Sequence, residues 1–264
     1  MRSRQYLHKI STVAIVLLIG IVSVLPLTAC SGNDPVTLTI FAAAGSKPAL
    51  DRIASRYEED HDVAIKITYA GAGEALSQIE LTSSGDVFVA PEQSFMEKAA
   101  AKGVIDTSTV VVIAGMKPVI AVAEGNPLGI TCLADLCADG IEVGVTRQET
   151  TLLGVFAPQI FEKAGLTEDI ADNIITEAAR PDNLLTALAM NQVDAGILWN
   201  FYGIQSADNV DIIEIPDEQL TGIGEMRAAV ISFAENKDTA QDFVDYLTSA
   251  GSKTVFDSLG YLTD

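Results

Sequence analysis

The sequence predicts an α/β fold with two lobes, each a mostly parallel β-sheet flanked by helices. Short segments rich in β-branched residues alternate with longer segments whose apolar residues recur every three or four positions. This alternation starts twice, once at residue 36 and again near residue 118. Strands that alternate with helices form parallel sheets through right-handed crossovers, so each series predicts one lobe.

The first series occupies residues 36–102. Val36–Phe41 alternates along a β-branched run, which predicts a strand. From Lys47 onward, Leu50, Ile53 and Tyr57 share one face at helical spacing. The same reasoning predicts two further strands and two further helices, at Val63–Tyr69, Asp86–Ala90, Glu74–Ser84 and Gln93–Lys102.

Two strands then follow in quick succession, Val110–Ala114 and Pro118–Ala123, separated by Gly115-Met116-Lys117, and the second series begins at the latter, near residue 118. Helices are predicted after residue 151, over residues 240–256, and after Pro181, because proline favours the first turn of a helix. The remaining strands are predicted at Ile141–Val145, Val193–Trp199, Val210–Ile215 and Arg227–Phe233.

The C-terminal strand and helices need a core of their own to pack against. The second series already looks complete, so we predict that the C-terminal part returns to the first lobe. Lobe I would then comprise residues 36–117 and 227–264, and lobe II residues 118–226. The two crossings, near Lys117–Val119 and Met226–Ala228, would form a hinge.

The N-terminus has the features of an export signal. Three cations precede the apolar stretch Ile10–Leu27, which predicts a signal peptide over residues 1–29. Leu27-Thr28-Ala29-Cys30 resembles the bacterial lipobox, so we expect lipid on Cys30, a tether over residues 30–35 and anchoring to the cell membrane. The alternative is a single N-terminal transmembrane helix in which Cys30 is incidental.

Charge and composition limit the partners and the chemistry. The formal net charge is −20, and cleavage of residues 1–29 would remove three cations and no acid, giving about −23, which disfavours nucleic acid. His61 would be the only histidine left, and the sequence has no GxSxG, HExxH or P-loop motif. We therefore predict a binding protein without catalytic residues, metal or cofactor. A secreted hydrolase with paired carboxylates is the remote alternative.

Cys132 and Cys137 lie five residues apart in Cys-Leu-Ala-Asp-Leu-Cys. Outside the cytoplasm this separation can close across a turn, so we predict a structural disulfide, with two free buried thiols as the alternative.

Several short motifs occur in the same order as in a known family. They are Phe41-Ala42-Ala43-Ala44, Tyr69-Ala70-Gly71-Ala72-Gly73, Asp86–Ala90, Gly125-Asn126-Pro127 and Val193–Ile197. Over residues 36–264 the chain resembles the molybdate/tungstate-binding proteins of ABC importers. The resemblance implies the periplasmic-binding-protein type II fold, a bound oxyanion as the transported ligand, and a membrane permease and an ATPase as partners. We expect a monomer.

Backbone N–H groups at helix N-termini can hold an oxyanion between such lobes, because the helix dipole adds positive charge there. Four candidate termini follow Gly45-Ser46, Ala72-Gly73, Thr151–Gly154 and Asp182-Asn183. Glycine lets the backbone approach a ligand closely. We expect Ser46 to act as a hydroxyl donor and as an N-cap.

The resemblance also assigns individual ligand contacts. It places the family's two binding serines at Gly45 and Ala72, its two backbone donors at Leu153 and Leu184, and its tyrosine at Trp199. Ser46 and Gly73 are the neighbours that would take part in place of the missing serines. The predicted ligand is molybdate or tungstate, and the alternative is another small anion or a small polar organic solute. Glu74 and Glu149 would repel an oxyanion, whereas Lys47 and Arg147 lie near the same loops and would compensate.

Overall fold

Residues 36–263 are described by the computed structural model of the protein. The predicted signal peptide, the lipid attachment site at Cys30 and the tether lie outside the described residues. Among residues 36–263, none of the helices combines the length and the apolar character needed to span a bilayer.

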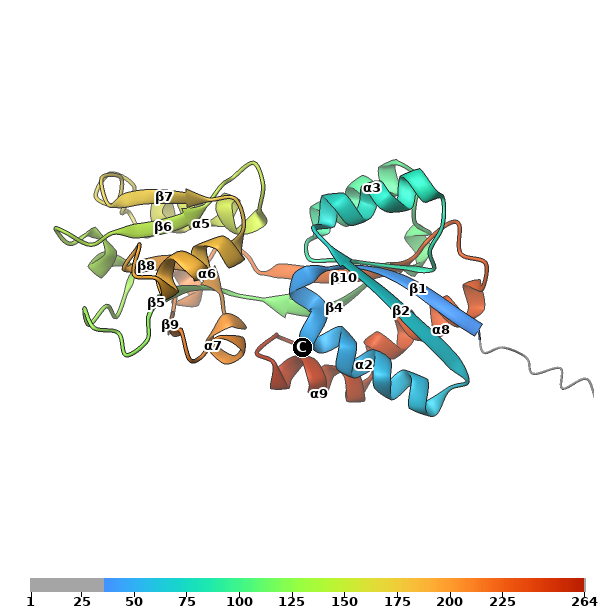
Figure 1. Ribbon diagram of the computed structural model, residues 1–264. Coiled ribbons are helices and arrows are strands. Elements are labelled where there is room, and N and C mark those ends of the chain that lie inside the picture. Colours follow the sequence, from blue (N-terminus) through green and yellow to red (C-terminus); the bar gives the residue numbers. More distant parts are fainter. Residues whose placement is uncertain (1–35, 264) are drawn as a thin grey trace, which may run out of the picture. The chain divides into compact units, whose positions relative to one another are not determined.

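The first of two five-stranded sheets has the strand order β2-β1-β3-β10-β4 (Figure 1). Its strands are β1 (Val36–Ala43), β2 (Val63–Ala70), β3 (Val87–Ala90), β4 (Val111–Met116) and β10 (Gly224–Val230). Strand β10 pairs antiparallel with both β3 and β4, so the other four strands share one direction. The flanking helices are α2 (Lys47–Asp60), α3 (Ala72–Thr82), α4 (Gln93–Ala101), α8 (Lys237–Leu247) and α9 (Ala250–Ser258).

Successive side chains of β1 point to opposite faces of this sheet and join two separate cores. Ile40 belongs to the cluster that contains Tyr57 of α2 and Phe243 of α8. Phe41 belongs to the cluster that contains Ile79 of α3 and Met96 of α4. Helices therefore cover both faces, as the continuously buried strand β3 requires.

The second sheet has the strand order β7-β6-β8-β5-β9. Its strands are β5 (Pro118–Ala123), β6 (Val143–Thr146), β7 (Ile174–Ala178), β8 (Ala195–Trp199) and β9 (Val210–Glu214). Here β5 is the reversed strand, because it pairs antiparallel with both β8 and β9. The helices are α5 (Leu152–Lys163), α6 (Pro181–Ala189) and α7 (Tyr202–Gln205). Four 3-10 turns complete the described elements: η1 (Ala44–Ser46), η2 (Thr107–Thr109), η3 (Leu133–Cys137) and η4 (Asp217–Gln219).

The predicted α/β fold with two mostly parallel sheets is confirmed. Two short elements were not predicted. β7 is an edge strand whose side chains alternate between half-buried and exposed, so its apolar signal is weak. The four residues of α7 are too few to show helical periodicity.

The chain passes between the two sheets at β4–β5 and again before β10. Lys117 alone separates β4 from β5, within the predicted crossing. At the second crossing, Gly224 and Met226 already pair with Met116 and Ala114 of β4, so the crossing precedes Gly224 and does not lie at Met226–Ala228. Gly224 fits inside the strand, because a Cβ there would lie 2.9 Å from the Trp199 ring.

Cys132 and Cys137 are both free thiols, which corrects the predicted disulfide. Cys132 is the N-cap of η3 and Cys137 is its last residue. Because a 3-10 helix rises about 2 Å per residue, their Cα atoms lie roughly 10 Å apart, beyond the limit of about 7 Å for a disulfide. The Cys132 side chain instead accepts a hydrogen bond from the backbone N–H of Asp135.

Candidate functional site

Three loops leave the first sheet side by side at the carboxyl ends of β1, β2 and β3. Ala43 pairs with Ala70, and Ala42 pairs with Val89, so these three parallel strands end at the same edge. Ligands of open α/β sheets bind at this kind of edge. The loops carry Gly45 and Ser46, then Ala72 and Gly73, and finally Pro91 and Glu92.

In the first loop, Gly45 is exposed and Ser46 is fully buried. The Tyr261 hydroxyl donates a hydrogen bond of 2.8 Å to the Gly45 carbonyl oxygen, which fixes the loop to the C-terminal segment. The Ser46 hydroxyl donates to the Ala43 carbonyl oxygen at 2.6 Å. Ser46 stands at the start of α2 but its side chain caps no amide, because its backbone is already helical (φ −82°, ψ −8°). The predicted side-chain cap by Ser46 is therefore wrong. The role of its hydroxyl as a ligand donor stays a prediction, and the hydroxyl would have to leave the Ala43 carbonyl oxygen to fill it.

In the second loop, Ala72 begins α3 after an extended Gly71. Within residues 36–263, the amides of Ala72 and Gly73 form no hydrogen bond, and the first bond back to the loop comes from Ala75 to Gly71 at 2.8 Å. These two amides are free to hold an anionic group. Glu74 lies exposed in the same turn and opposes a second negative charge.

The second sheet presents a corresponding edge at the ends of β6, β7 and β8. Thr146 pairs with Ala178, and Gly144 pairs with Gly196, so these strands also run parallel. The three predicted contacts of this lobe follow them in order: Leu153 in α5, Leu184 in α6 and Trp199 at the end of β8. The topology therefore places all seven predicted ligand contacts at the carboxyl edges of the two sheets.

Helix α5 begins close against strand β6. The Thr151 hydroxyl accepts the Gly154 amide at 2.9 Å and bonds the Thr146 hydroxyl at 2.8 Å. A Cβ on Gly154 would lie 2.3 Å from the Arg147 carbonyl oxygen, so only glycine allows this approach. The Leu153 amide donates to no residue in the described part of the chain. It therefore remains available to a ligand.

Helix α6 is different, because its amide at the predicted contact is in use. The Leu184 amide donates to the Arg180 carbonyl oxygen at 3.3 Å, and Asn183 donates to the same oxygen at 3.1 Å. The Arg180 guanidinium pairs with Asp182 in the first turn. A ligand bound to the Leu184 amide would have to share it with the Arg180 carbonyl oxygen.

Trp199 is 4 % exposed and its ring meets Phe156 edge-on, with ring centroids 6.2 Å apart. The indole N–H donates no hydrogen bond to another described residue. The next aromatic residue, Phe201, packs elsewhere: its ring stacks on Tyr261 with the ring centroids 4.7 Å apart.

One hydrogen bond joins the two edges directly. Glu92 accepts the Leu152 amide at 3.0 Å, so a carboxylate from the first sheet meets the first amide of α5 in the second. Glu92 is 9 % exposed, and burial raises the pKa of its carboxyl, while the bond from Leu152 and the charge of Lys98 partly oppose this rise. The sequence analysis missed Glu92. Its position in the loop that follows the third strand of the series could have pointed to it.

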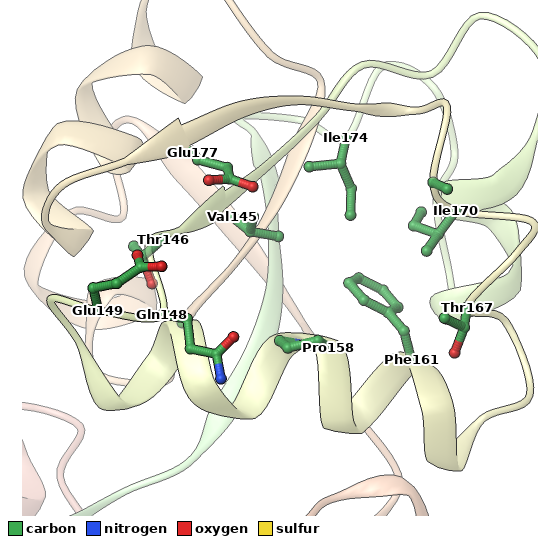
Figure 2. A pocket seen from close by; sticks show the side chains of 12 residues that line it. Val145, Thr146, Gln148, Glu149, Pro158, Phe161, Thr167, Ile170, Ile174 and Glu177 are labelled. Atoms are coloured by element: carbon green, nitrogen blue, oxygen red, sulfur yellow. The ribbon is translucent and has the colours of Figure 1, made fainter.

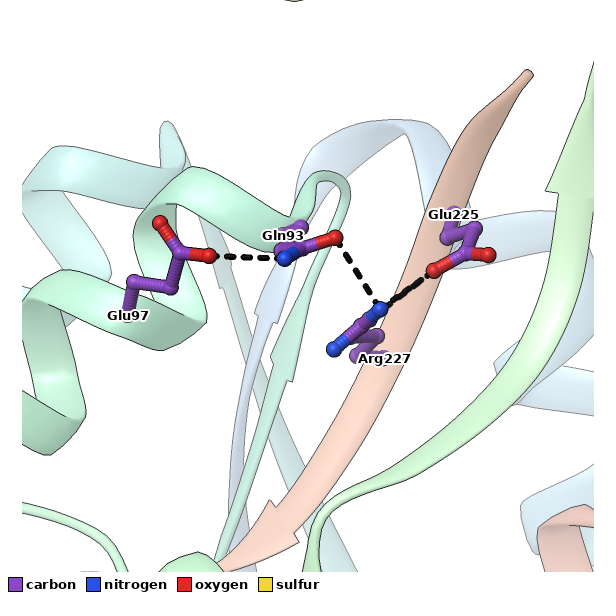
Figure 3. A network of polar contacts seen from close by, with 4 residues as sticks. All are labelled: Gln93, Glu97, Glu225 and Arg227. Atoms are coloured by element: carbon purple, nitrogen blue, oxygen red, sulfur yellow. Dashed lines mark hydrogen bonds and ion pairs between the residues drawn. The ribbon is translucent and has the colours of Figure 1, made fainter. Parts of the chain in front are cut away.

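Two of the positive charges near these edges are paired with acids of the protein, whereas Arg147 donates to the Glu177 carbonyl oxygen at 3.2 Å. Arg227, whose register partner is Ala90 at the end of β3, forms an ion pair with Glu225 and donates to Gln93 (Figure 3). Lys47 pairs with Asp51 at 2.7 Å and lies 4.6 Å from the centre of the Tyr69 ring. The positive charge of Lys47, which was expected to offset the charge of Glu74, is therefore paired with Asp51.

A separate cavity of about 290 Å³ lies between α5 and strands β6 and β7 (Figure 2). Val145, Phe161 and Ile174 give it an apolar floor, and Glu149 and Glu177 lie at one end. None of the seven predicted contacts lines it. Among residues 36–263 there is no cluster of three or more histidine, cysteine, aspartate or glutamate side chains suited to a metal ion.

The comparisons with known proteins agree with this geometry. Residues 38–262 match the sequence pattern of the family described as bacterial extracellular solute-binding protein. The molybdate-binding protein ModA of Escherichia coli is 23 % identical over 244 residues, 88 % of this chain and 93 % of that protein. YvgL, a provisionally named ABC transporter substrate-binding lipoprotein of Bacillus subtilis, is 23 % identical over 243 residues, 89 % of this chain and 92 % of that protein.

Two solved structures share the fold at low sequence identity. Peb3 of Campylobacter jejuni, bound to L-phospholactate, has a TM-score of 0.75 and 18 % identity, covering 85 % of this chain and 99 % of that one. The periplasmic molybdate-binding protein of Azotobacter vinelandii has a TM-score of 0.71 and 17 % identity, covering 85 % and 98 %.

Proposed function

The chain belongs to the family of bacterial extracellular solute-binding proteins, and on that premise we propose that it captures a small solute between two lobes for an ABC importer. The meeting of the two carboxyl edges at Glu92 and Leu152 is the observation that carries the proposal. Closure about the hinge would add donors from the second sheet and exclude water, and the closed form would be the one that the transporter recognises. The partners are a membrane permease and an ATPase, and the protein itself needs no catalytic group.

The proposed lobes follow the two sheets. Lobe I comprises residues 36–117 with the C-terminal part, and lobe II comprises the residues between the crossings. Because β10 begins at Gly224, the second hinge segment is placed immediately before that residue.

Attachment to the membrane is part of the same proposal. Cleavage before Cys30 and lipidation of its thiol would hold the protein at the outer face of the membrane, near its transporter. The lipobox-like Leu27–Cys30 and the lipoprotein name of the Bacillus subtilis relative support it. Cys30→Ala should release the protein from the membrane fraction or leave an uncleaved precursor. Mass spectrometry that finds an unmodified Cys30 in the native mature protein would refute lipidation.

For the ligand, molybdate and tungstate remain candidates, because two relatives in sequence or fold are molybdate-binding proteins. The free amides of Ala72, Gly73 and Leu153 suit an anionic group. The second candidate is a small organic acid. Two observations favour the organic acid over a tetrahedral dianion. The Glu92 carboxylate adds a negative charge that would repel a dianion. The Ser46 hydroxyl already donates within the protein, which leaves one donor fewer for the ligand.

Calorimetric titration of the mature protein with molybdate, tungstate, sulfate, phosphate and a set of small organic acids tests the function and separates the candidates. We expect saturable 1:1 binding of at least one solute together with a rise in melting temperature. If every solute gave neither heat nor a shift in melting temperature, solute capture of this class would be refuted.

A further inference from the structure

Glu92 occupies a position where an anionic ligand would be expected to bind. The first amides of a helix attract negative charge, and at α5 the first of them, that of Leu152, already donates to Glu92. The neighbouring Leu153 amide, the predicted ligand contact, lies one residue further along the same turn. The protein therefore supplies its own carboxylate beside the second-lobe anion contact.

This carboxylate is well enclosed and not neutralised by an ion pair. Its side chain is 9 % exposed, and its second oxygen, Oε2, forms no hydrogen bond within residues 36–263. The cations nearest along the chain form no ion pair with it: Arg227 pairs with Glu225, and Lys98, whose charge partly opposes the rise in the pKa of Glu92, lies over the Phe95 ring. Arg227 also donates to Gln93, as Figure 3 shows.

A fully deprotonated oxyanion at Leu153 would lie next to this charge in a desolvated setting, where like charges repel far more strongly than in water. We propose that Glu92 is a specificity-determining residue, which excludes dianions from the second-lobe donors and admits solutes whose group at this position is neutral or donates a hydrogen bond. This inference rests on the proposed function. It narrows the solute class to molecules with their negative charge at the lobe I edge, near Ala72 and Gly73.

The test uses tungstate as the probe dianion at pH 7.5, titrated into the mature protein and into Glu92→Gln. The glutamine keeps an oxygen that accepts the Leu152 amide but removes the charge. Glu97→Gln is the matched control, because it removes one negative charge at an exposed position of α4, the helix that begins directly after Glu92. We expect Glu92→Gln to bind tungstate at least tenfold more tightly than the wild type, and Glu97→Gln to differ from the wild type by less than twofold. Glu92→Ala is a second variant, whose gain in tungstate affinity should be similar if the charge is the cause.

Folding of each variant is checked by its circular dichroism spectrum and melting temperature. Equal or weaker tungstate binding by Glu92→Gln, or no binding by any of the proteins, would overturn the role of Glu92. The proposed function is judged separately, by whether the wild type binds any solute of the calorimetric set. If the wild type bound an organic acid tightly and Glu92→Gln showed no gain in tungstate affinity, only the role of Glu92 would be rejected. If Glu92→Gln gained tungstate binding while the wild type bound no solute of the calorimetric set, the exclusion of dianions by Glu92 would be supported and the proposed function would be rejected.

Discussion

Asn200 and Lys117 hold each other through two hydrogen bonds at the first crossing between the sheets. The Lys117 amide donates to Asn200 Oδ1 at 2.8 Å, and the Asn200 amide donates to the Lys117 carbonyl oxygen at 2.9 Å. Asn200 Nδ2 also donates to the Gly260 carbonyl oxygen at 2.6 Å. One side chain therefore fixes the end of β8, the crossing residue and the C-terminal segment together.

Asn200→Ala should lower the free energy of unfolding by about 2–3 kcal/mol, because it leaves one amide and one carbonyl without their partner. Urea unfolding followed by circular dichroism measures this change. Asn209→Ala is the control, since that residue is exposed and its side chain makes no hydrogen bond in the described chain. Equal midpoints for the two variants would contradict the role of Asn200 as an anchor.

Gly224 allows β10 to pass beneath the Trp199 ring at the second crossing. A Cβ at this position would lie 2.9 Å from the ring and 3.1 Å from Met116 Cε. Gly224→Ala should therefore destabilise the protein by about 1–3 kcal/mol through overpacking. Gly251→Ala, in helix α9, where an added Cβ would meet only Ser249 Oγ at an ordinary contact distance of 3.8 Å, should instead be neutral or stabilise by up to about 1 kcal/mol. Thermal unfolding of both variants gives the comparison, and a stabilising Gly224→Ala would show that the crossing is loosely packed.

The sequence was sufficient for the order of strands and helices, because their apolar periodicity is strong and local. Val36–Phe41 and the α2 face through Leu50, Ile53 and Tyr57 were predicted with nearly their observed bounds. The second crossing was misplaced because the last strand was predicted to begin at Arg227, whereas β10 begins at Gly224. The fit of Gly224 under the Trp199 ring depends on a residue distant in the chain and leaves no local pattern in the sequence.

The candidate site was predictable only in its location. Loops after parallel strands meet at one edge, so topology alone gathers Gly45 and Ala72 at the first sheet and places Leu153 at the corresponding edge of the second sheet. The direction of the Ser46 hydroxyl and the bond from Leu152 to Glu92 depend on backbone angles and contacts between distant segments. No periodicity or motif encodes them.

Cys132 and Cys137 should both react with a thiol reagent in the folded protein without residues 1–30. Cys132 is exposed and should react rapidly with a disulfide reagent at pH 8. Cys137 is half-buried, and burial raises the pKa of its thiol, so its reaction should be slower. Stopped-flow absorbance with the single Cys132→Ser and Cys137→Ser variants assigns the phases. A protein purified without reductant that shows no free thiol would restore the disulfide.

The pH dependence of stability should report the buried state of Glu92. Burial raises the pKa of this carboxyl above its ordinary value in the unfolded chain. Below the unfolded pKa the group is protonated in both states, and as the pH rises through the folded pKa, proton release favours the unfolded chain, so stability is lost. The glutamine of Glu92→Gln does not titrate, so this variant does not lose that part of the stability as the pH rises. Glu92→Gln should therefore gain in melting temperature relative to the wild type between pH 4 and pH 7.5, whereas Glu97→Gln should follow the wild-type profile. Parallel profiles for all three proteins would mean that the Glu92 carboxylate is as well stabilised in the folded protein as in water.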